Sequence, residues 1–329
     1  MSYATIKPKF YLLANISGLI YTLLMLDIQT FNSWPSIAAC GNTLSLLGGK
    51  IFFYDSWRGL HSPKQEPDEQ KPVLVFVHGL GDEADTWRHI LPILSEKGYR
   101  CIAPDLPGFG RSQWRGRISI SRHANAVIRL MTECGVSRPA VLIGSSMGCG
   151  VAEVVAFRRP DLVQAVILID GCFPLHGSVS KGLLLLGLPF IGKRWYRSFR
   201  KNHEAAWKSL YPYYHGLDAM SDDDKKFLRE RVIARVESGN QERGYFASLR
   251  NITVNFMFGR ASFSRKLKKI KGKLLLLWGE HDHIMPVKKT ALFRELRPDA
   301  QLKTIAGAGH LPHQEKPKET AETVLAFLE

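Results

Sequence analysis

The sequence AVLIGSSMGCG, residues 140–150, decides the fold class because it joins a strand, a turn and a helix. Its first four residues predict a short buried strand, and the segment Gly-Ser-Ser-Met-Gly predicts a sharp turn that opens a helix. A serine in such a turn has a strained backbone, and glycines two positions before and after it prevent a collision where strand and helix pack closely. Ser146 has these glycines, Gly144 and Gly148, whereas Ser145 does not. We predict that Ser146 is a nucleophile and that Ser145 packs or forms a hydrogen bond.

Short apolar segments alternate with helical patterns on both sides of this turn. Expected strands cover residues 50–54, 72–77, 99–104, 140–143, 165–169, 273–278 and 301–306, and expected helices cover residues 86–97, 119–134, 149–159, 287–297 and 318–328. Strands that alternate with helices predict a parallel sheet with helices on both faces. The expected fold class is therefore α/β, with a doubly wound, mostly parallel sheet.

Residues 173–267 interrupt this alternation. They contain an apolar run, an aromatic and basic stretch, and a charged helix that Ser221 should cap, with acids in its first turn. A structureless loop of this length is implausible in a compact domain, so we predict a mainly helical cap, inserted after the sixth strand, that serves as a substrate lid. The predicted organisation is an amino-terminal apolar segment and linker (1–48), the first part of the core (49–172), the cap (173–267) and the second part of the core (268–329).

Two later strands end in loops that carry an acid and a histidine. The strand at 273–278 leads into Gly-Glu-His-Asp-His, which places Asp282 at a strand's carboxyl end, where ligand sites of parallel sheets form. The last strand leads into Gly-Ala-Gly-His, which presents His310. A serine hydroxyl needs an imidazole to take its proton and a carboxylate to fix the imidazole tautomer. We predict a triad of Ser146, His310 and Asp282, with Asp170, which also ends a strand, as the alternative acid.

Two backbone amides should complete the site by stabilising the negative charge that develops on the substrate's carbonyl oxygen. One is the amide of Met147, directly after the nucleophile, and the other is the amide of Leu80, in the His-Gly-Leu-Gly turn after the strand at 72–77. His78 is expected to orient this turn. Asp105, in a turn-rich loop, is expected to bond backbone amides.

The composition restricts the possible partners. A formal net charge of +15 favours an anionic partner, such as nucleic acid or the anionic face of a membrane, but the chain has no nucleic-acid recognition motif. The basic residues concentrate at 193–208 and 265–273. Five cysteines without CxxC or Cys/His spacing suggest neither a zinc site nor a disulfide framework. We expect free thiols, no metal, no cofactor and no nucleic-acid partner.

Residues 10–26 (FYLLANISGLIYTLLML) carry no charge. As a helix they would span about 25 Å, slightly less than the roughly 30 Å hydrocarbon core of a bilayer. Three interpretations stay open: a single-pass anchor, an amphipathic helix on a membrane or on the domain itself, and the apolar part of an export signal. We expect membrane association through this segment rather than a freely soluble protein.

Five motifs in this order resemble those of the α/β-hydrolase superfamily: HGLGD (78–82), DLPGFGRS (105–112), GSSMG (144–148), GEHD (279–282) and GAGH (307–310). The resemblance covers residues 49–173 and 273–329. It implies carboxylesterase, lipase-like or carbon-carbon hydrolase chemistry through a serine nucleophile and without a cofactor. Epoxide hydrolases and haloalkane dehalogenases share the fold but use aspartate, so Ser146 argues against both. One departure is Cys149, where many relatives have a second glycine.

The leading functional hypothesis is a serine esterase that acts on a hydrophobic acyl ester through an acyl-enzyme. Its basis is the leucine run at 183–186, the basic and aromatic stretch that begins at Lys193, and the amino-terminal segment, which together suggest a small hydrophobic ester at a membrane surface. Two alternatives stay open: a carbon-carbon hydrolase of a ketonic substrate, and a ligand receptor that keeps the triad.

Overall fold

The computed structural model of the chain describes residues 33–60, 70–173 and 185–329. The described residues form one nine-stranded sheet in the order β1-β2-β4-β3-β6-β7-β8-β9, with β5 paired to β2. The strands from β4 to β9 in this order pair in parallel, whereas β2 is antiparallel to each of its neighbours. The predicted doubly wound, mostly parallel α/β sheet is therefore confirmed. The strands are β1 (Gly41–Leu46), β2 (Gly49–Asp55), β3 (Leu74–Val77), β4 (Cys101–Pro104), β5 (Gln113–Trp114), β6 (Ala140–Ser145), β7 (Val163–Ile169), β8 (Lys273–Gly279) and β9 (Gln301–Ile305).

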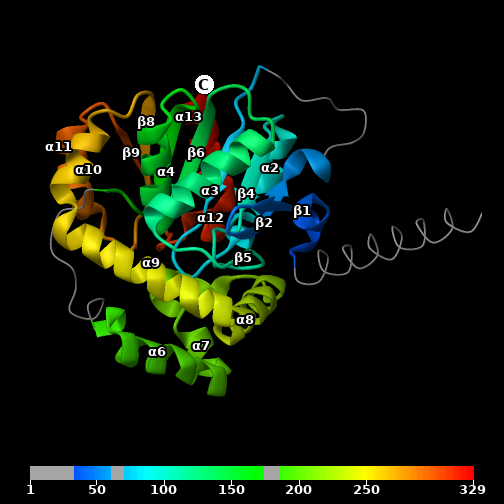
Figure 1. Ribbon diagram of the computed structural model, residues 1–329. Coiled ribbons are helices and arrows are strands. Elements are labelled where there is room, and N and C mark those ends of the chain that lie inside the picture. The colour runs from blue at the N-terminus through cyan, green and yellow to red at the C-terminus, as the bar shows by residue number, and fades with distance from the viewer. Residues whose placement is uncertain (1–32, 61–69, 174–184) are drawn as a thin grey trace, which may run out of the picture.

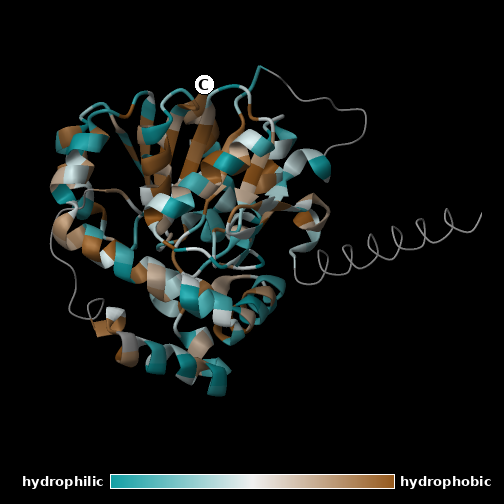
Figure 2. Cartoon of the chain, in the orientation of Figure 1, coloured by the Kyte–Doolittle hydropathy of each residue, from teal (hydrophilic) through white to brown (hydrophobic). Residues whose placement is uncertain are grey.

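Helices cover both faces of this sheet. On one face, strand residues such as Leu142 and Leu276 pack in a cluster with residues of α3 (Ile120–Glu133) and α4 (Met147–Arg158). On the other face, alternate strand residues such as Ile143 and Leu277 pack with α2 (Ile90–Glu96) and α13 (Pro317–Leu328). Because both faces are buried, the central strands are apolar almost throughout, as their brown colour in Figure 2 shows. Two shorter helices, α11 (Ala291–Leu296) and α12 (Pro312–Glu315), complete the core.

The cap lies between β7 and β8 in the chain and comprises α6 (Pro189–Ser198), α7 (His203–Lys208), α8 (Asp222–Glu237), α9 (Gly239–Phe258) and α10 (Arg260–Leu267). Figure 1 shows α6, α7, α8 and α9 together on one side of the sheet. The Ser221 side chain caps α8 by accepting a hydrogen bond from the Asp224 amide, as predicted. The cap follows the seventh strand of the described chain rather than the sixth, because β1 and β5 precede it in addition to the five strands expected before residue 173.

The sheet begins earlier than the sequence analysis placed it. β1, which was assigned to an amino-terminal linker, pairs with β2 from Gly41 to Leu46, and Ile37 and Cys40 before it are buried. The pattern was weak because every β1 side chain is at least partly exposed. Residues 10–26 lie outside the described residues. Across residues 33–60, 70–173 and 185–329, no helix combines the length and apolar character needed to cross a membrane.

Candidate active site

Ser146 lies at the junction of β6 and α4 with φ 51° and ψ −115°, a backbone conformation that few residues other than glycine adopt. The positions of the flanking glycines have no room for a side chain. A Cβ atom at Gly144 would lie 2.6 Å from the backbone of Gly148, and one at Gly148 would lie 2.0 Å from the carbonyl oxygen of Val77. The sheet and α4 therefore hold the serine in a strained turn, with its side chain on the wall of a cavity.

His310 and Asp282 form a hydrogen-bonded pair beside this serine. The distance from His310 Nδ1 to Asp282 Oδ2 is 2.8 Å, and both side chains are buried. The other Asp282 oxygen accepts hydrogen bonds from the backbone amides of Ile284 (2.9 Å) and Met285 (2.8 Å). Burial opposes ionisation of Asp282, but these donors, with His310 foremost, lower the pKa of its carboxyl below the ordinary value. His310 Nε2 has no partner among the described residues, and His310 lines the same cavity as Ser146.

Asp170, the alternative acid, follows β7 and contacts Asp282 rather than His310. Its Oδ1 accepts a hydrogen bond from the Gly279 amide at 2.9 Å, and no hydrogen bond joins it to the histidine. Burial, and then the charge of Asp282, raise the pKa of the Asp170 carboxyl well above its ordinary value. Within the described part of the chain, Asp170, Asp282 and His310 are the one group whose ligand atoms lie close enough together to hold a metal ion.

The two amides expected to stabilise an oxyanion belong to the residue that follows Ser146 and to a turn that packs against it. Met147 is the first residue of α4, so its amide is one of the N–H groups that lack an intrahelical partner. Leu80 lines the cavity, and a Cβ atom on the preceding Gly79 would lie 3.2 Å from Ser146 Cβ, so this turn packs directly against the serine. Among the described residues neither amide donates a hydrogen bond. Both are free to bind a ligand oxygen.

The residues assigned supporting roles in these loops make the expected contacts. His78 Nδ1 lies 2.8 Å from the Gly79 carbonyl oxygen and its Nε2 accepts a hydrogen bond from the Leu106 amide, an arrangement that requires the neutral ring. Burial lowers the pKa of this histidine accordingly. Asp105 accepts a hydrogen bond from the Ala84 amide at 2.7 Å, so it fixes the backbone next to the same turn.

Ser145 and Cys149 lie behind the serine turn rather than in the cavity. Ser145 is buried and its hydroxyl has no partner among the described residues, so its role is packing alone. The Cys149 sulfur lies 3.2 Å from the Gly144 carbonyl oxygen and 3.4 Å from that of Ile169, so its single S–H has two acceptors within reach in this buried position. All five cysteines are free, as predicted, and four of them are buried.

The cavity has a floor of core residues and a roof of cap residues. Aromatic rings and several aliphatic side chains of the cap form the roof: Trp195, Tyr196, Phe199, Leu210, Tyr213, Tyr214, Val232, Val236 and Tyr245. Leu80 and Leu311 of the core also line the cavity. The cap also contacts the histidine loop, because the His310 amide donates a hydrogen bond to the Tyr213 carbonyl at 2.8 Å. Sequence reasoning missed these residues because they come from several separate cap elements with no common spacing.

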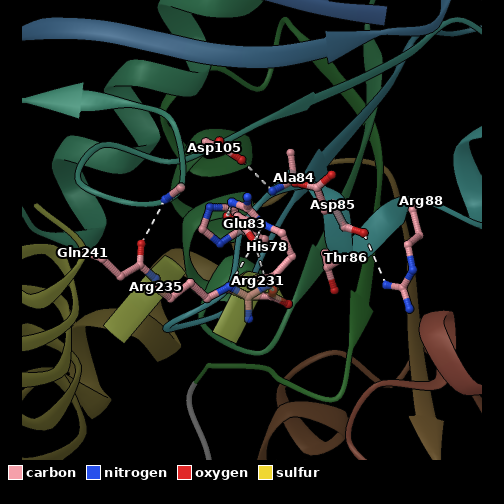
Figure 3. A network of polar contacts seen from close by, with 12 residues as sticks. His78, Glu83, Ala84, Asp85, Thr86, Arg88, Asp105, Arg231, Arg235 and Gln241 are labelled. Atoms are coloured by element: carbon pink, nitrogen blue, oxygen red, sulfur yellow. Dashed lines mark hydrogen bonds and ion pairs between the residues drawn. The ribbon is translucent and has the colours of Figure 1, made fainter. Parts of the chain in front are cut away.

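A second feature that the sequence analysis missed is a buried ion-pair network between the cap and the core (Figure 3). Glu83 follows the Leu80 turn and is fully buried, yet it accepts hydrogen bonds from both Arg231 and Arg235 of α8. Arg235 also pairs with Asp82 at 2.9 Å and lines the cavity. Burial alone would raise the pKa of the Glu83 carboxyl, but the two guanidinium groups hold it well below the ordinary value.

A parallel sheet with a serine in a strained strand-to-helix turn and a histidine-carboxylate pair at the strand ends defines a hydrolase of the α/β type. The family model described as "alpha/beta hydrolase fold" matches residues 72–317. The chain therefore belongs to the α/β-hydrolase family, and the family resemblance is confirmed.

Individual proteins similar to this chain include hydrolases and esterases. The uncharacterized hydrolase YugF of Bacillus subtilis is 29% identical over 270 residues, which cover 80% of this chain and 92% of that protein. A pimeloyl-[acyl-carrier protein] methyl ester esterase of Cronobacter sakazakii is 28% identical over 258 residues, with 77% and 92% covered. The structure of a bacterial membrane phospholipase A superposes with a TM-score of 0.69 at 25% identity, covering 97% of this chain and 95% of the other. A thermophilic esterase from Thermogutta terrifontis (TM-score 0.68, 20% identity, 87% and 98% covered) shares the fold.

Proposed function

We propose that the protein is a serine hydrolase that cleaves a carboxylic ester through a triad of Ser146, His310 and Asp282. The observation that carries the proposal is that one cavity is lined both by a serine at φ 51° and by a histidine whose Nδ1 is held by a carboxylate. The Nδ1 hydrogen bond fixes the tautomer in which Nε2 accepts a proton. The names of two similar proteins, a methyl ester esterase and a membrane phospholipase A, agree with an ester substrate.

The proposed reaction proceeds in two halves. Ser146 Oγ attacks the ester carbonyl while His310 Nε2 takes the hydroxyl proton, and Asp282 stabilises the imidazolium that forms. The amides of Leu80 and Met147 receive the oxyanion, and in measured cases a single such donor is worth about 3–4 kcal/mol of barrier. His310 then returns the proton to the departing alkoxide, which leaves as the alcohol. Water, deprotonated by His310, hydrolyses the acyl-enzyme and restores the serine.

The proposed substrate carries a hydrophobic acyl group, because aromatic and aliphatic cap side chains face the serine across the cavity. The outward face of α6 has similar character. Phe190 is 89% exposed, Ile191 is 48% exposed, and Arg194 on the same face is also exposed. Trp195 belongs both to this face and to the cavity wall. We therefore propose that the ester is drawn from an anionic lipid surface, which an exposed apolar and basic helix face would bind.

The test is active-site labelling combined with a series of p-nitrophenyl esters of increasing acyl length. We expect a fluorophosphonate probe to label wild type, Ser146→Ala to abolish labelling, and kcat to fall by at least about 10⁴-fold in that variant. Ser145→Ala is the matched control, since the Ser145 hydroxyl has no partner and its loss should leave labelling unchanged. Unlabelled wild-type protein would contradict the enzyme proposal. A preference for the shortest esters would contradict the hydrophobic substrate and leave the triad in place.

A further inference from the structure

We propose that Asp170 is a positioning residue that, as a neutral carboxylic acid, donates a hydrogen bond to Asp282 and so holds the carboxylate that orients His310. This inference rests on the proposed function, because it assigns a role to a group next to the proposed triad. Neither the sequence pattern nor the family resemblance gave Asp170 any role except that of a rival acid. The structure instead places its carboxyl within 4.8 Å of both the Asp282 carboxyl and the His310 ring, without a hydrogen bond to the histidine.

The position of Asp170 is built into the fold. The residue is fully buried, directly after β7, and its amide donates a hydrogen bond to the Leu277 carbonyl at 3.0 Å. Its φ is 48°, and Ser146 is the one other non-glycine residue in the described part of the chain with a positive φ. A positive φ is costly for most side chains and persists where surrounding contacts enforce it. Asp170 and Ser146 therefore mark two strained strand ends in the same site.

The carboxyl of Asp170 has one donor and one acidic neighbour. Its Oδ1 accepts from the Gly279 amide at 2.9 Å, whereas its Oδ2 is buried with no donor among the described residues. Carboxyl oxygens of Asp170 and Asp282 lie within 4.8 Å of each other, close enough for the two groups to interact directly. Two carboxylates in contact inside a protein cannot both stay ionised, so one proton lies between them.

The donors around each carboxyl decide which one keeps the proton. Asp282 accepts three hydrogen bonds, from two backbone amides and from His310, whereas Asp170 accepts one. Hydrogen bonds to a carboxylate favour its ionised form, so Asp282 is the anion and Asp170 the acid. The other titratable groups that face Asp170 are Cys149, on α4, and Glu315, on α12; the Glu315 charge adds to the rise in the Asp170 pKa. The directions of the two pKa shifts agree with this assignment, since that of Asp170 is raised and that of Asp282 is lowered.

The O–H of Asp170 restrains the carboxylate on which the histidine depends. Apart from the His310 bond at Oδ2, Asp282 is held only at Oδ1, by the Ile284 and Met285 amides, and without a further donor it could turn about its terminal bond away from His310. A neutral donor fixes the carboxylate without placing a second negative charge beside the imidazole. In metal sites, groups of this kind that orient a primary ligand are worth about 10–100-fold in activity or affinity.

The decisive variants are Asp170→Asn and Asp170→Gly, both in the full chain. Asparagine keeps an acceptor for the Gly279 amide, an N–H donor for Asp282 and a tolerance for positive φ. Glycine relieves the backbone strain but removes the donor. With a short p-nitrophenyl ester we expect Asp170→Asn to keep kcat and the midpoint of the ascending limb of kcat/KM against pH. We expect Asp170→Gly to lower kcat about tenfold with KM unchanged. Asparagine would also restore a purely structural role, so the discriminating readout is the loss of kcat in Asp170→Gly with KM and the urea midpoint unchanged.

The proton itself can be observed without catalysis. At neutral pH the wild-type protein should show the infrared carbonyl band of a protonated Asp170 carboxyl, and Asp170→Asn should lose this band. Glu153→Gln is the control, because burial raises the pKa of the Glu153 carboxyl as well. This readout keeps the inference separate from the proposed function, since it holds even if Ser146 is never labelled. Three results would overturn the inference: an infrared band that is unchanged in Asp170→Asn, a shift of the ascending limb of kcat/KM to lower pH in that variant, or inactivation by EDTA that a divalent cation reverses.

Discussion

The serine turn and the cap bound the same cavity, but different forces hold them. At the turn, β3 and α4 meet so closely that Gly148 admits no Cβ atom, and the surrounding side chains pack in an apolar cluster. The cap adds buried charge to its apolar contacts with the core: Glu83 pairs with Arg231 and Arg235, and Arg88 pairs with Asp224. Apolar periodicity reveals the first kind of contact in a sequence, whereas buried ion pairs between distant segments leave no periodic pattern. Substitutions in the two regions should therefore differ in their effects on stability and activity.

The largest effect should come from Gly148→Ala. The new methyl carbon would lie 2.0 Å from the Val77 carbonyl oxygen, and both atoms belong to backbone that cannot rotate away. We expect a loss of about 4 kcal/mol or more of unfolding free energy and no fluorophosphonate labelling. Gly239→Ala in the cap is the matched control, because a Cβ atom there meets nothing within 4 Å. Urea unfolding monitored by circular dichroism measures both, and equal losses in the two variants would contradict the comparison.

A smaller but still severe effect is expected for Glu83→Gln. The change removes the negative charge between two guanidinium groups that are mostly buried, and an uncompensated buried charge costs about 3 kcal/mol. Urea unfolding at pH 7 gives the size of the loss. Arg159→Ala breaks the exposed Arg159–Asp161 pair and should leave the urea midpoint unchanged. If Glu83→Gln left the urea midpoint unchanged, the cap would be held by its apolar contacts alone.

The same variant has a defined pH signature. The pKa of Glu83 is depressed in the folded protein, so its contribution to stability is complete above the pKa of an unfolded glutamate, near 4.5, and declines as the pH falls below that value. The difference in unfolding free energy between wild type and Glu83→Gln should therefore shrink from pH 7 to pH 3. A difference that stays constant over this range would show that the carboxylate is not the stabilising group.

The sequence predicted the core far better than the cap, and the reason is physical. β6 and β8 are buried on both faces, so their apolar runs stand out, and the glycine spacing around Ser146 is forced by contact. Asp282 was predicted because it follows such a strand. The role of Asp170 could not be predicted in the same way, because the sequence does not show whether an aspartate is protonated or ionised in the folded protein. The cavity roof and the Glu83 pairs depend on how separate helices dock, which no local pattern specifies.

The smallest effect on the chemistry, and the sharpest contrast between cap and core, should come from the outward face of α6. Phe190→Ser with Ile191→Ser removes exposed apolar surface without touching the cavity wall, so hydrolysis of a short soluble ester should not change. If α6 binds an anionic lipid surface, hydrolysis of a long-chain ester in phosphatidylglycerol vesicles should fall at least tenfold, because fully burying even one such side chain contributes about 1.5–3 kcal/mol and about 1.4 kcal/mol is a factor of ten. Leu47→Ser is the control, since Leu47 is fully exposed on the β1–β2 turn of the core. Two results would show that the cap does not distinguish an anionic surface: equal losses in the α6 variant and in Leu47→Ser, or equal wild-type rates on phosphatidylcholine and phosphatidylglycerol vesicles. A selective loss would show that the region poorly encoded by pattern is the one that selects the substrate.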